Sequence, residues 1–167
     1  MQKIVDLRDL LIQQLRDLYN SEQQQISILQ QLADQASTPE LQEIIQHHHR
    51  QTQHQKQRLL SLFDLLELEP EGESCEGMKG IISETRQLLK RTADPEVADA
   101  AIITAIQHIN HYEIAGYGTA ISYAKALKLE QVAEWLLDTI REEKQADSDL
   151  SEVAEAHINA RATMAKP

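Results

Sequence analysis

Apolar residues recur every three or four positions along most of this chain, which is the spacing of an amphipathic α-helix. The pattern predicts four long helices and one shorter helix, at residues 6–36, 39–67, 77–91, 95–128 and 130–160. Thr38-Pro39 and Asp94-Pro95 each supply an N-cap residue followed by proline at the first helical position, which indicates two helix starts. Residues after about 161 are expected to form a frayed tail.

The connections between the predicted helices differ in length. Short turns join the first two long helices and the last two, whereas residues 68–94 form a long crossover that contains the short helix. Four helices with one long crossover are typical of the ferritin-like topology. We therefore predict an all-α, ferritin-like four-helix bundle that forms a single domain over residues 1–167. A kink is expected near Asp147-Ser148-Asp149, because serine and aspartate can cap a new helix there.

The composition limits the classes of partner and compartment. Apolar residues make up 41% of the 167 residues and aromatic residues 4%, which fits a helical globular domain. A formal net charge of -11 argues against nucleic acid and anionic membranes as partners, and no apolar run approaches the roughly 20 residues of a membrane span. No signal peptide is recognisable. The lone Cys75 cannot form an intramolecular disulfide, which favours a cytoplasmic location, and is expected to be a buried side chain rather than a nucleophile.

Each long helix carries polar residues on its otherwise apolar face. Glu113, for example, continues a line of three isoleucines, and an unpaired charge in a core costs several kcal/mol. With a rise of about 1.5 Å per residue, Glu22 and Glu143 lie level with inward polar residues of the other two helices. The predicted inward layer consists of Glu22, His48, Gln51, Gln55, Asn110, Glu113, Glu143 and Asp147.

Two interpretations of this layer remain open at the level of sequence. Carboxylates that converge in a low-dielectric core repel one another, and a bound divalent cation removes that repulsion, as in di-iron carboxylate bundles. Alternatively, the amides of Gln51, Gln55 and Asn110 donate hydrogen bonds to the acids, with Arg50 or Lys144 as ion-pair partners. The layer is then structural and needs no metal.

The histidines do not form a chelating cluster. Consecutive helix residues point about 100° apart, so His47, His48 and His49 cannot share one ion, and only His48 is expected to face inward. His54 and His108 are predicted on outer faces, and His111 in a packing contact or helix interface. The glutamine-rich tract 23–25 is predicted to be helix surface.

Four segments of the chain resemble one known family. They are Asp17-Leu-Tyr-Asn-Ser-Glu22, Ser74-Cys-Glu-Gly-Met-Lys-Gly-Ile-Ile-Ser-Glu84, His111-Tyr-Glu-Ile-Ala-Gly-Tyr-Gly-Thr119 and Leu136-Leu-Asp-Thr-Ile-Arg-Glu-Glu-Lys-Gln-Ala-Asp147. They resemble the YciF-type bacterial stress-response proteins, and the resemblance covers nearly the whole chain. It implies a ferritin-like bundle in the cytoplasm, commonly a homodimer, with a suspected di-iron-type centre and no firmly assigned reaction.

The resemblance also has two departures in the inward layer. The residues that match the family's inward positions are Glu22, Glu113, Glu143 and Asp147, together with His48 and Thr52 of the second helix. Gln51 and Asn110, however, stand where the family often has glutamates. A neutral amide is a weaker ligand for a hard cation than a carboxylate, so a two-metal site with six protein ligands is not expected.

Two functional hypotheses follow. In the first, Glu22, Glu113, Glu143 and Asp147 hold iron or manganese, with His48 or Gln55 as a supplementary group. If iron binds, the expected activity is that of an oxidoreductase that oxidises ferrous iron with oxygen or peroxide. In the second, the protein is a metal-free helical homodimer with a structural or stress-protective binding role, and the polar layer fixes the register of the helices.

Overall fold

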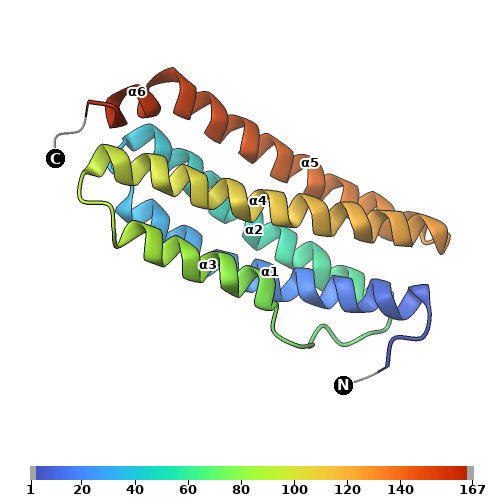
Figure 1. Cartoon of the computed structure of the whole chain (residues 1–167). Coiled ribbons are helices and arrows are strands. Elements are labelled where there is room, and N and C mark those ends of the chain that lie inside the picture. The colour runs from blue at the N-terminus through green and yellow to red at the C-terminus, as the bar shows by residue number, and fades with distance from the viewer. Residues whose placement is uncertain (1–2, 165–167) are drawn as a thin grey trace.

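The structure, a computed structural model that describes residues 3–164, is all-helical over that range, which confirms the predicted class (Figure 1). Its elements are α1 (Leu7–Gln35), α2 (Pro39–Leu65), α3 (Glu76–Leu89), α4 (Pro95–Ala126), α5 (Glu130–Val153), a π-helical turn (Ala154–Ile158) and α6 (Asn159–Ala162). These bounds lie close to the predicted ones except at the end of the last long helix. The chain positions after 164, part of the expected tail, lie outside the described residues.

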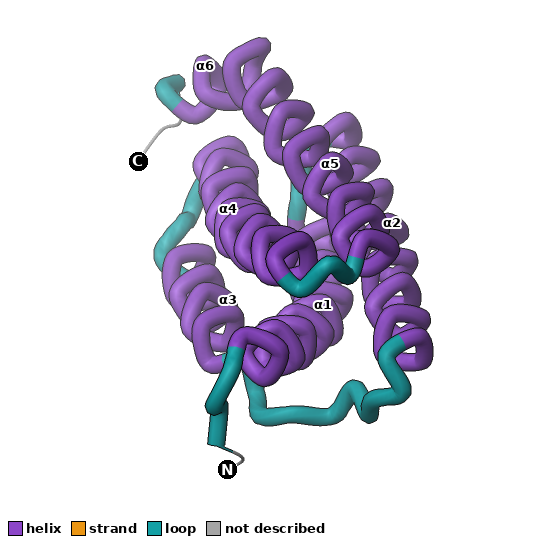
Figure 2. Tube along the Cα trace, turned by 90° about the vertical axis from the view of Figure 1, so that its right-hand side faces the viewer, coloured by secondary structure: helices purple, strands orange, loops and turns teal. Residues whose placement is uncertain are grey.

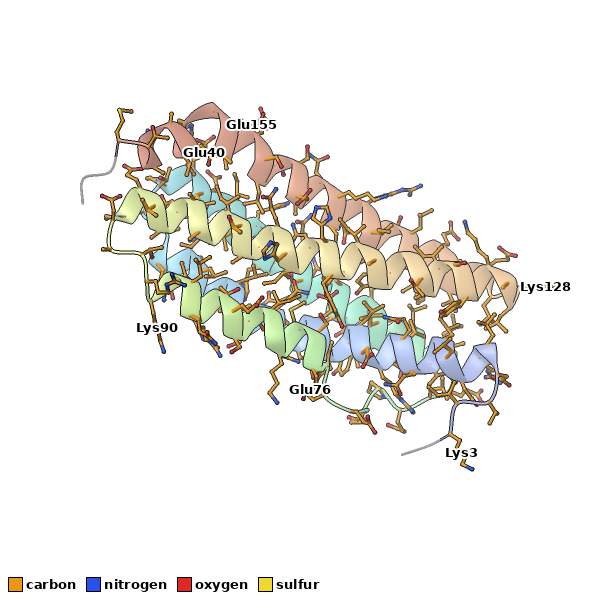
Figure 3. All side chains as sticks on the ribbon, in the orientation of Figure 1. Lys3, Glu40, Glu76, Lys90, Lys128 and Glu155 are labelled. Atoms are coloured by element: carbon orange, nitrogen blue, oxygen red, sulfur yellow. The ribbon has the colours of Figure 1, made fainter. Side chains whose placement is uncertain are left out.

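The four long helices lie side by side. α1 packs against α2 and α4, and α5 packs against α4 and α2, so that each long helix has two long neighbours (Figures 1 and 2). The shorter α3 lies outside this group, against α4 and α1, and buries Met78, Ile82 and Thr85 there. Glu40 and Glu155 lie near one end of the molecule and Lys128 at the other (Figure 3).

The apolar core is divided into two clusters. One contains Leu32, Leu41, Ile106 and Leu150, together with α3 residues such as Met78 and Ile82, and the other contains Leu15, Leu62, Ala120 and Leu136. Buried polar residues of all four long helices lie between the two clusters, among them Glu22, His48, Glu113 and Glu143. Within residues 3–164 no helix has the length and apolar character needed to cross a membrane.

The last long helix departs from the prediction. The expected kink near Asp147-Ser148-Asp149 is wrong, because α5 continues unbroken to Val153. The polar side chains there bond along the helix instead of capping a new one: the Ser151 hydroxyl donates to the Asp147 carbonyl at 3.0 Å, and the Gln145 amide donates to Asp149 at 2.7 Å. The irregularity lies later, in the π-helical turn.

The turn between α1 and α2 is held by an acid from α4. Asp99, which is fully buried, accepts hydrogen bonds from the backbone N–H groups of Ser37 and Thr38, at 2.7 and 2.9 Å. It also accepts from their hydroxyls, at 2.8 and 2.5 Å. Thr38 is the N-cap of α2, and its hydroxyl serves Asp99 rather than its own helix. Asp99 therefore fixes the start of α2 against α4.

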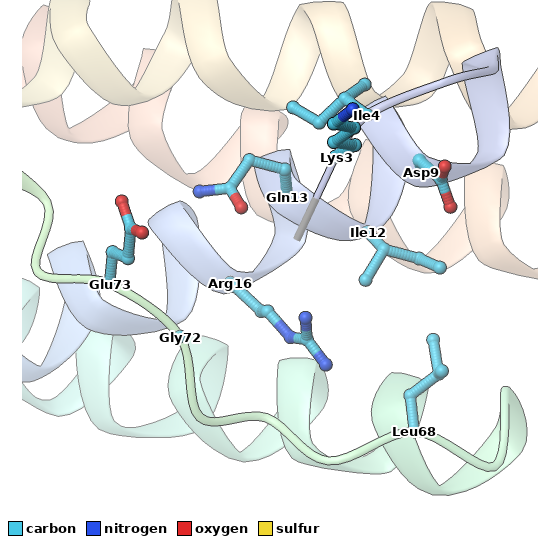
Figure 4. Close-up of a pocket in the computed structure, with 9 residues that line it drawn as sticks. All are labelled: Lys3, Ile4, Asp9, Ile12, Gln13, Arg16, Leu68, Gly72 and Glu73. Atoms are coloured by element: carbon cyan, nitrogen blue, oxygen red, sulfur yellow. The ribbon is translucent and has the colours of Figure 1, made fainter. Parts of the chain in front are cut away.

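The connection from α2 to α3 lies along the first half of α1. The Arg16 guanidinium donates to the Glu69 carbonyl at 3.2 Å, and the side chain borders a hollow that Ile12 and Leu68 also line (Figure 4). A Cβ at Gly72 would lie 2.9 Å from the Arg16 Cβ, so this close approach requires a glycine. Arg16 and Gly72 thus hold the long crossover against the bundle.

We predict that Asp99→Asn lowers the free energy of unfolding by about 2–4 kcal/mol, measured by chemical denaturation. The amide would present an N–H group to donors that now face a carboxylate oxygen, which leaves part of the turn unsatisfied. Asp34→Asn, on the exposed face of α1, is the control and is expected to change stability by less than about 0.5 kcal/mol. Equal effects of the two substitutions would show that Asp99 does not hold the turn.

Candidate functional site

A layer of buried polar side chains crosses the middle of the molecule. All four long helices contribute to it: Ser21, Glu22 and Gln25 from α1, His48, Thr52 and Gln55 from α2, Asn110, Glu113 and Tyr117 from α4, and Thr139 and Glu143 from α5. Each of these side chains is at most 2% exposed. The layer lies where the two apolar clusters end, so water is excluded from both sides of it.

Three of these residues are carboxylates, and each has one partnered oxygen. Glu22 Oε1 accepts a short hydrogen bond from the Tyr117 hydroxyl, and Glu113 Oε1 accepts from the Ser21 hydroxyl at 3.0 Å. Glu143 Oε1 accepts from the Gln55 amide at 2.9 Å and lies 3.4 Å from His48 Nε2. The other oxygen, Oε2, of all three carboxylates is buried and has no hydrogen-bond partner among residues 3–164.

Burial and mutual repulsion hold two of these carboxylates toward their protonated forms. The pKa of Glu22 is raised well above its ordinary value, first by burial and then by the charges of Glu113 and Glu143, against the opposing hydrogen bond from Tyr117. The pKa of Glu113 is also raised well above its ordinary value, by burial and by Glu143, although the Ser21 and Gln25 side chains oppose the shift. The layer is therefore short of positive charge.

An ion pair at the edge of the layer connects it to the surface. The Arg58 guanidinium binds both carboxylate oxygens of Glu142, at 2.9 and 3.0 Å, and also donates to the Thr139 hydroxyl at 2.6 Å. The pKa of Glu142 is lowered in spite of its partial burial, because Arg58 and Gln55 donate hydrogen bonds to it. The Gln55 amide donates to both Glu142 and Glu143, so this pair positions an amide of the buried layer.

The two amides at positions 51 and 110 differ in where they lie. Gln51 is partly exposed and lines a surface hollow, since the buried line of α2 runs through His48, Thr52 and Gln55 and leaves Gln51 on its flank. Asn110 is buried as predicted. Oriented to satisfy both ends of its amide, it donates to the Ile106 carbonyl at 3.0 Å and accepts from the Asp147 N–H at 3.3 Å.

Asp147 differs from its predicted role in the centre of the layer. It is 22% exposed, and its Oδ2 lies 3.3 Å from Nε2 of the exposed His111, while its Oδ1 is buried and unpartnered within the described chain. His111 is exposed rather than packed, and its contact with Asp147 joins α4 to α5 at the surface. The other histidines of α2 lie on its outer face or flank, as expected from helix geometry; they are His47, His49 and His54.

Several residues of the layer are missing from the prediction. Gln25, placed on the helix surface by its glutamine-rich tract, is fully buried, three residues after Glu22 on the same helix face. Tyr117 follows Glu113 by four residues, and that spacing could have marked it as a neighbour of the acids. Ser21, by contrast, has no signal in the sequence beyond its position next to Glu22.

The layer contains chemical groups of the kinds that divalent cations accept as ligands. Carboxylate oxygens, the Gln55 carbonyl oxygen and an imidazole are ligands that iron and manganese accept, and Gln55 Oε1 and both His48 ring nitrogens have no hydrogen-bond partner in the described part of the chain. Gln51 lies on the flank of α2 and the Asn110 amide is engaged with Ile106 and Asp147, so neither supplies the carboxylate that the family often has there. Among residues 3–164, no three His, Cys, Asp or Glu side chains converge as ligands do around an ion.

Comparison with known proteins gives a family without an assigned activity. The family described as a domain of unknown function, DUF892, matches residues 6–163. Protein YciF of Escherichia coli K12 is 33% identical over 157 residues, which cover 93% of this chain and 95% of that protein. The chain therefore belongs to the DUF892 family of YciF-like proteins, which confirms the family predicted from the four segments.

Solved structures of relatives have the same arrangement of helices. The structure of the E. coli stress protein YciF matches with a TM-score of 0.89 and 32% identity, over 93% of this chain and 99% of that one. YcfI of Rhodopseudomonas palustris, for which a structural role has been suggested, matches with a TM-score of 0.88 and 36% identity, over 90% and 96% of the two chains. A protein from Xanthomonas campestris pv. campestris matches with a TM-score of 0.73 and 23% identity, over 93% and 95%, and supports the fold alone.

We predict that Glu113→Gln stabilises the protein relative to wild type in the presence of a chelator, and increasingly so as pH rises from 5 to 8. Because folding raises the pKa of Glu113, its carboxyl ionises in the unfolded chain near pH 4.5, at lower pH than in the folded protein. The wild-type protein therefore loses stability as the pH rises from there toward the pKa of the folded state. The glutamine does not titrate, so its stability advantage in chemical denaturation should grow steadily across this pH range. Glu134→Gln, on the exposed face of α5, is the control, and a difference independent of pH would contradict the prediction.

Proposed function

We propose that the buried layer is a binding site for one divalent cation, iron or manganese, in a cytoplasmic stress-response protein. Its ligands are Glu22, Glu113 and Glu143, with His48 and Gln55 as supplementary donors. Asp147, whose buried oxygen is unpartnered in the described chain, is a further ligand only if it leaves its pair with His111. The fold proposed to hold the ion is a ferritin-like four-helix bundle.

The observation that carries this proposal is the set of three buried carboxylates whose Oε2 atoms lack partners among the described residues. An ionised carboxylate in a core costs several kcal/mol unless a positive charge or hydrogen bonds compensate it. No lysine or arginine reaches these three oxygens within residues 3–164. Protons or a cation must therefore supply the compensation, and a cation also supplies favourable coordination.

The chain's own residues would prepare the site for the ion. The Tyr117 hydroxyl and the Ser21 hydroxyl each hold one oxygen of Glu22 and Glu113, which leaves the opposite oxygen available. The Gln55 amide does the same for Glu143. If iron binds, oxygen or peroxide would oxidise it from the ferrous to the ferric state. The surrounding apolar clusters would exclude bulk water.

A second candidate function is a metal-free homodimer with a structural or stress-protective role. Two observations favour it: the hydrogen bonds that already join Glu22, Glu113 and Glu143 to their neighbours, and the suggested structural role of the R. palustris relative. In that case Glu22 and Glu113 are protonated, which their raised pKa values permit. The polar layer then fixes the register of the helices.

Elemental analysis of untagged protein tests the first candidate. We expect about one iron or manganese ion per chain in wild type, and its loss in Glu113→Ala, because a carboxylate ligand is removed. Added Mn²⁺ at a hundredfold excess over its Kd is expected to raise the unfolding free energy by about 3 kcal/mol in wild type. Glu84→Gln, an exposed change on α3, should retain the ion.

Glu22→Gln, which preserves the volume of the side chain, provides the same test if Glu113→Ala fails to fold. Aerobic oxidation of ferrous iron, followed by absorbance, should be faster with wild type than with either variant. If wild type carries no metal and neither Fe²⁺ nor Mn²⁺ raises its melting temperature, the cation site is refuted. The metal-free role would then be preferred.

A further inference from the structure

A surface hollow of about 350 Å³ lies between α2 and α5 and reaches the buried layer. Its lining includes His48, which is only 2% exposed and whose two ring nitrogens have no hydrogen-bond partner among residues 3–164. On its inner side, the same imidazole lies 3.4 Å from Glu143. His48 thus separates the hollow from the carboxylates by the thickness of one side chain.

The outer walls of the hollow carry groups that attract cations. Glu43 and His47 lie one helical turn apart on α2, so their side chains are neighbours on the same face. Asp149 faces them from α5, and the acids Glu40, Glu43 and Asp149 outnumber the single Arg50. The Glu43 carboxylate makes no ion pair or hydrogen bond with any other described residue, whereas Glu40 lies 3.2 Å from His157 and Asp149 accepts from the Gln145 amide at 2.7 Å.

Two other hollows in the surface do not reach the layer. The hollow beside Arg16 and the one beside Arg86 are both lined by residues that lie outside the layer. The hollow beside Arg86 carries Arg86 and Lys90, which repel a cation. In the hollow beside Arg16, the charges of Lys3 and Arg16 are balanced by those of Asp9 and Glu73, so it does not attract a cation. The hollow between α2 and α5 is therefore the favourable approach of the three.

We propose that this hollow is the loading port through which a divalent cation enters the buried layer, with Glu43 and Asp149 as capture groups and His48 as the inner gate. The proposal rests on the proposed function, because it concerns the route to that same site. It describes a passage and not a second holding site, since no three His, Cys, Asp or Glu side chains of residues 3–164 converge on one point. Ala146, whose small side chain lies in the wall, keeps the passage open.

Two variants of the full-length protein test the port by the rate of Mn²⁺ uptake. Ala146→Phe places a ring in the hollow, which has room for it, and should slow both uptake and release about tenfold with the Kd unchanged. Glu43→Gln with Asp149→Asn should slow uptake about tenfold at low salt, and less at high salt, because electrostatic attraction is lost. Stopped-flow fluorescence of a Mn²⁺-chelating dye gives the rates, and electron paramagnetic resonance of free Mn²⁺ gives the Kd.

The matched control is Glu84→Gln with Glu134→Gln, which removes the same charge from exposed positions on α3 and α5. It should leave the uptake rate within about twofold of wild type. Uptake by both port variants at the wild-type rate would overturn the port while leaving the cation site in place. Failure of wild type to bind Mn²⁺ at all would overturn the proposed function, and the port with it.

Discussion

The burial of three carboxylates between two apolar clusters is the constraint on which the rest of this structure depends. Glu22, Glu113 and Glu143 are all fully buried, and each has an oxygen without a partner in the described chain. Charges in such surroundings are stable only when they are compensated. The hydroxyls of Tyr117 and Ser21 supply part of that compensation, and protons or a cation must supply the rest. A purely apolar layer would hold the helices together without this requirement, so stability alone does not explain the acids.

Polar contacts hold the helices around these acids together at one end of the bundle and beside the layer. Asp99 ties the α1–α2 turn to α4 through four hydrogen bonds, and the Arg58–Glu142 pair joins α2 to α5 beside the layer. These contacts join helices that the chain does not join directly. They fix the height at which the four helices present their polar residues, and that height sets the distances between the acids.

Much of this arrangement could be predicted from the sequence, because it follows from local rules. The helix starts follow from cap residues and prolines, and the inward positions of Glu22, His48, Gln55, Asn110, Glu113 and Glu143 follow from helical periodicity.

The remaining features depend on contacts between helices, which the sequence does not show. Gln51 and Thr52 are both near the inward face of α2, and only packing against α5 decides that Thr52 is buried. Asp147 turns to the surface because His111 of α4 pairs with it there, and Gln25 looked like surface because its neighbours are glutamines. The kink expected near Asp147-Ser148-Asp149 does not form, because serine and aspartate bond along the helix as readily as they cap it.

Proton release on Mn²⁺ binding tests the central claim most directly. If cation and protons compensate the same buried carboxylates, binding must displace protons from the layer, since Glu22 and Glu113 have raised pKa values in its absence. Isothermal titration calorimetry near pH 6, in two buffers of different ionisation enthalpy, counts those protons. We expect a release of about one to two protons per bound ion, reduced in Glu113→Gln. Binding without any proton release, or equal release from wild type and Glu113→Gln, would contradict it.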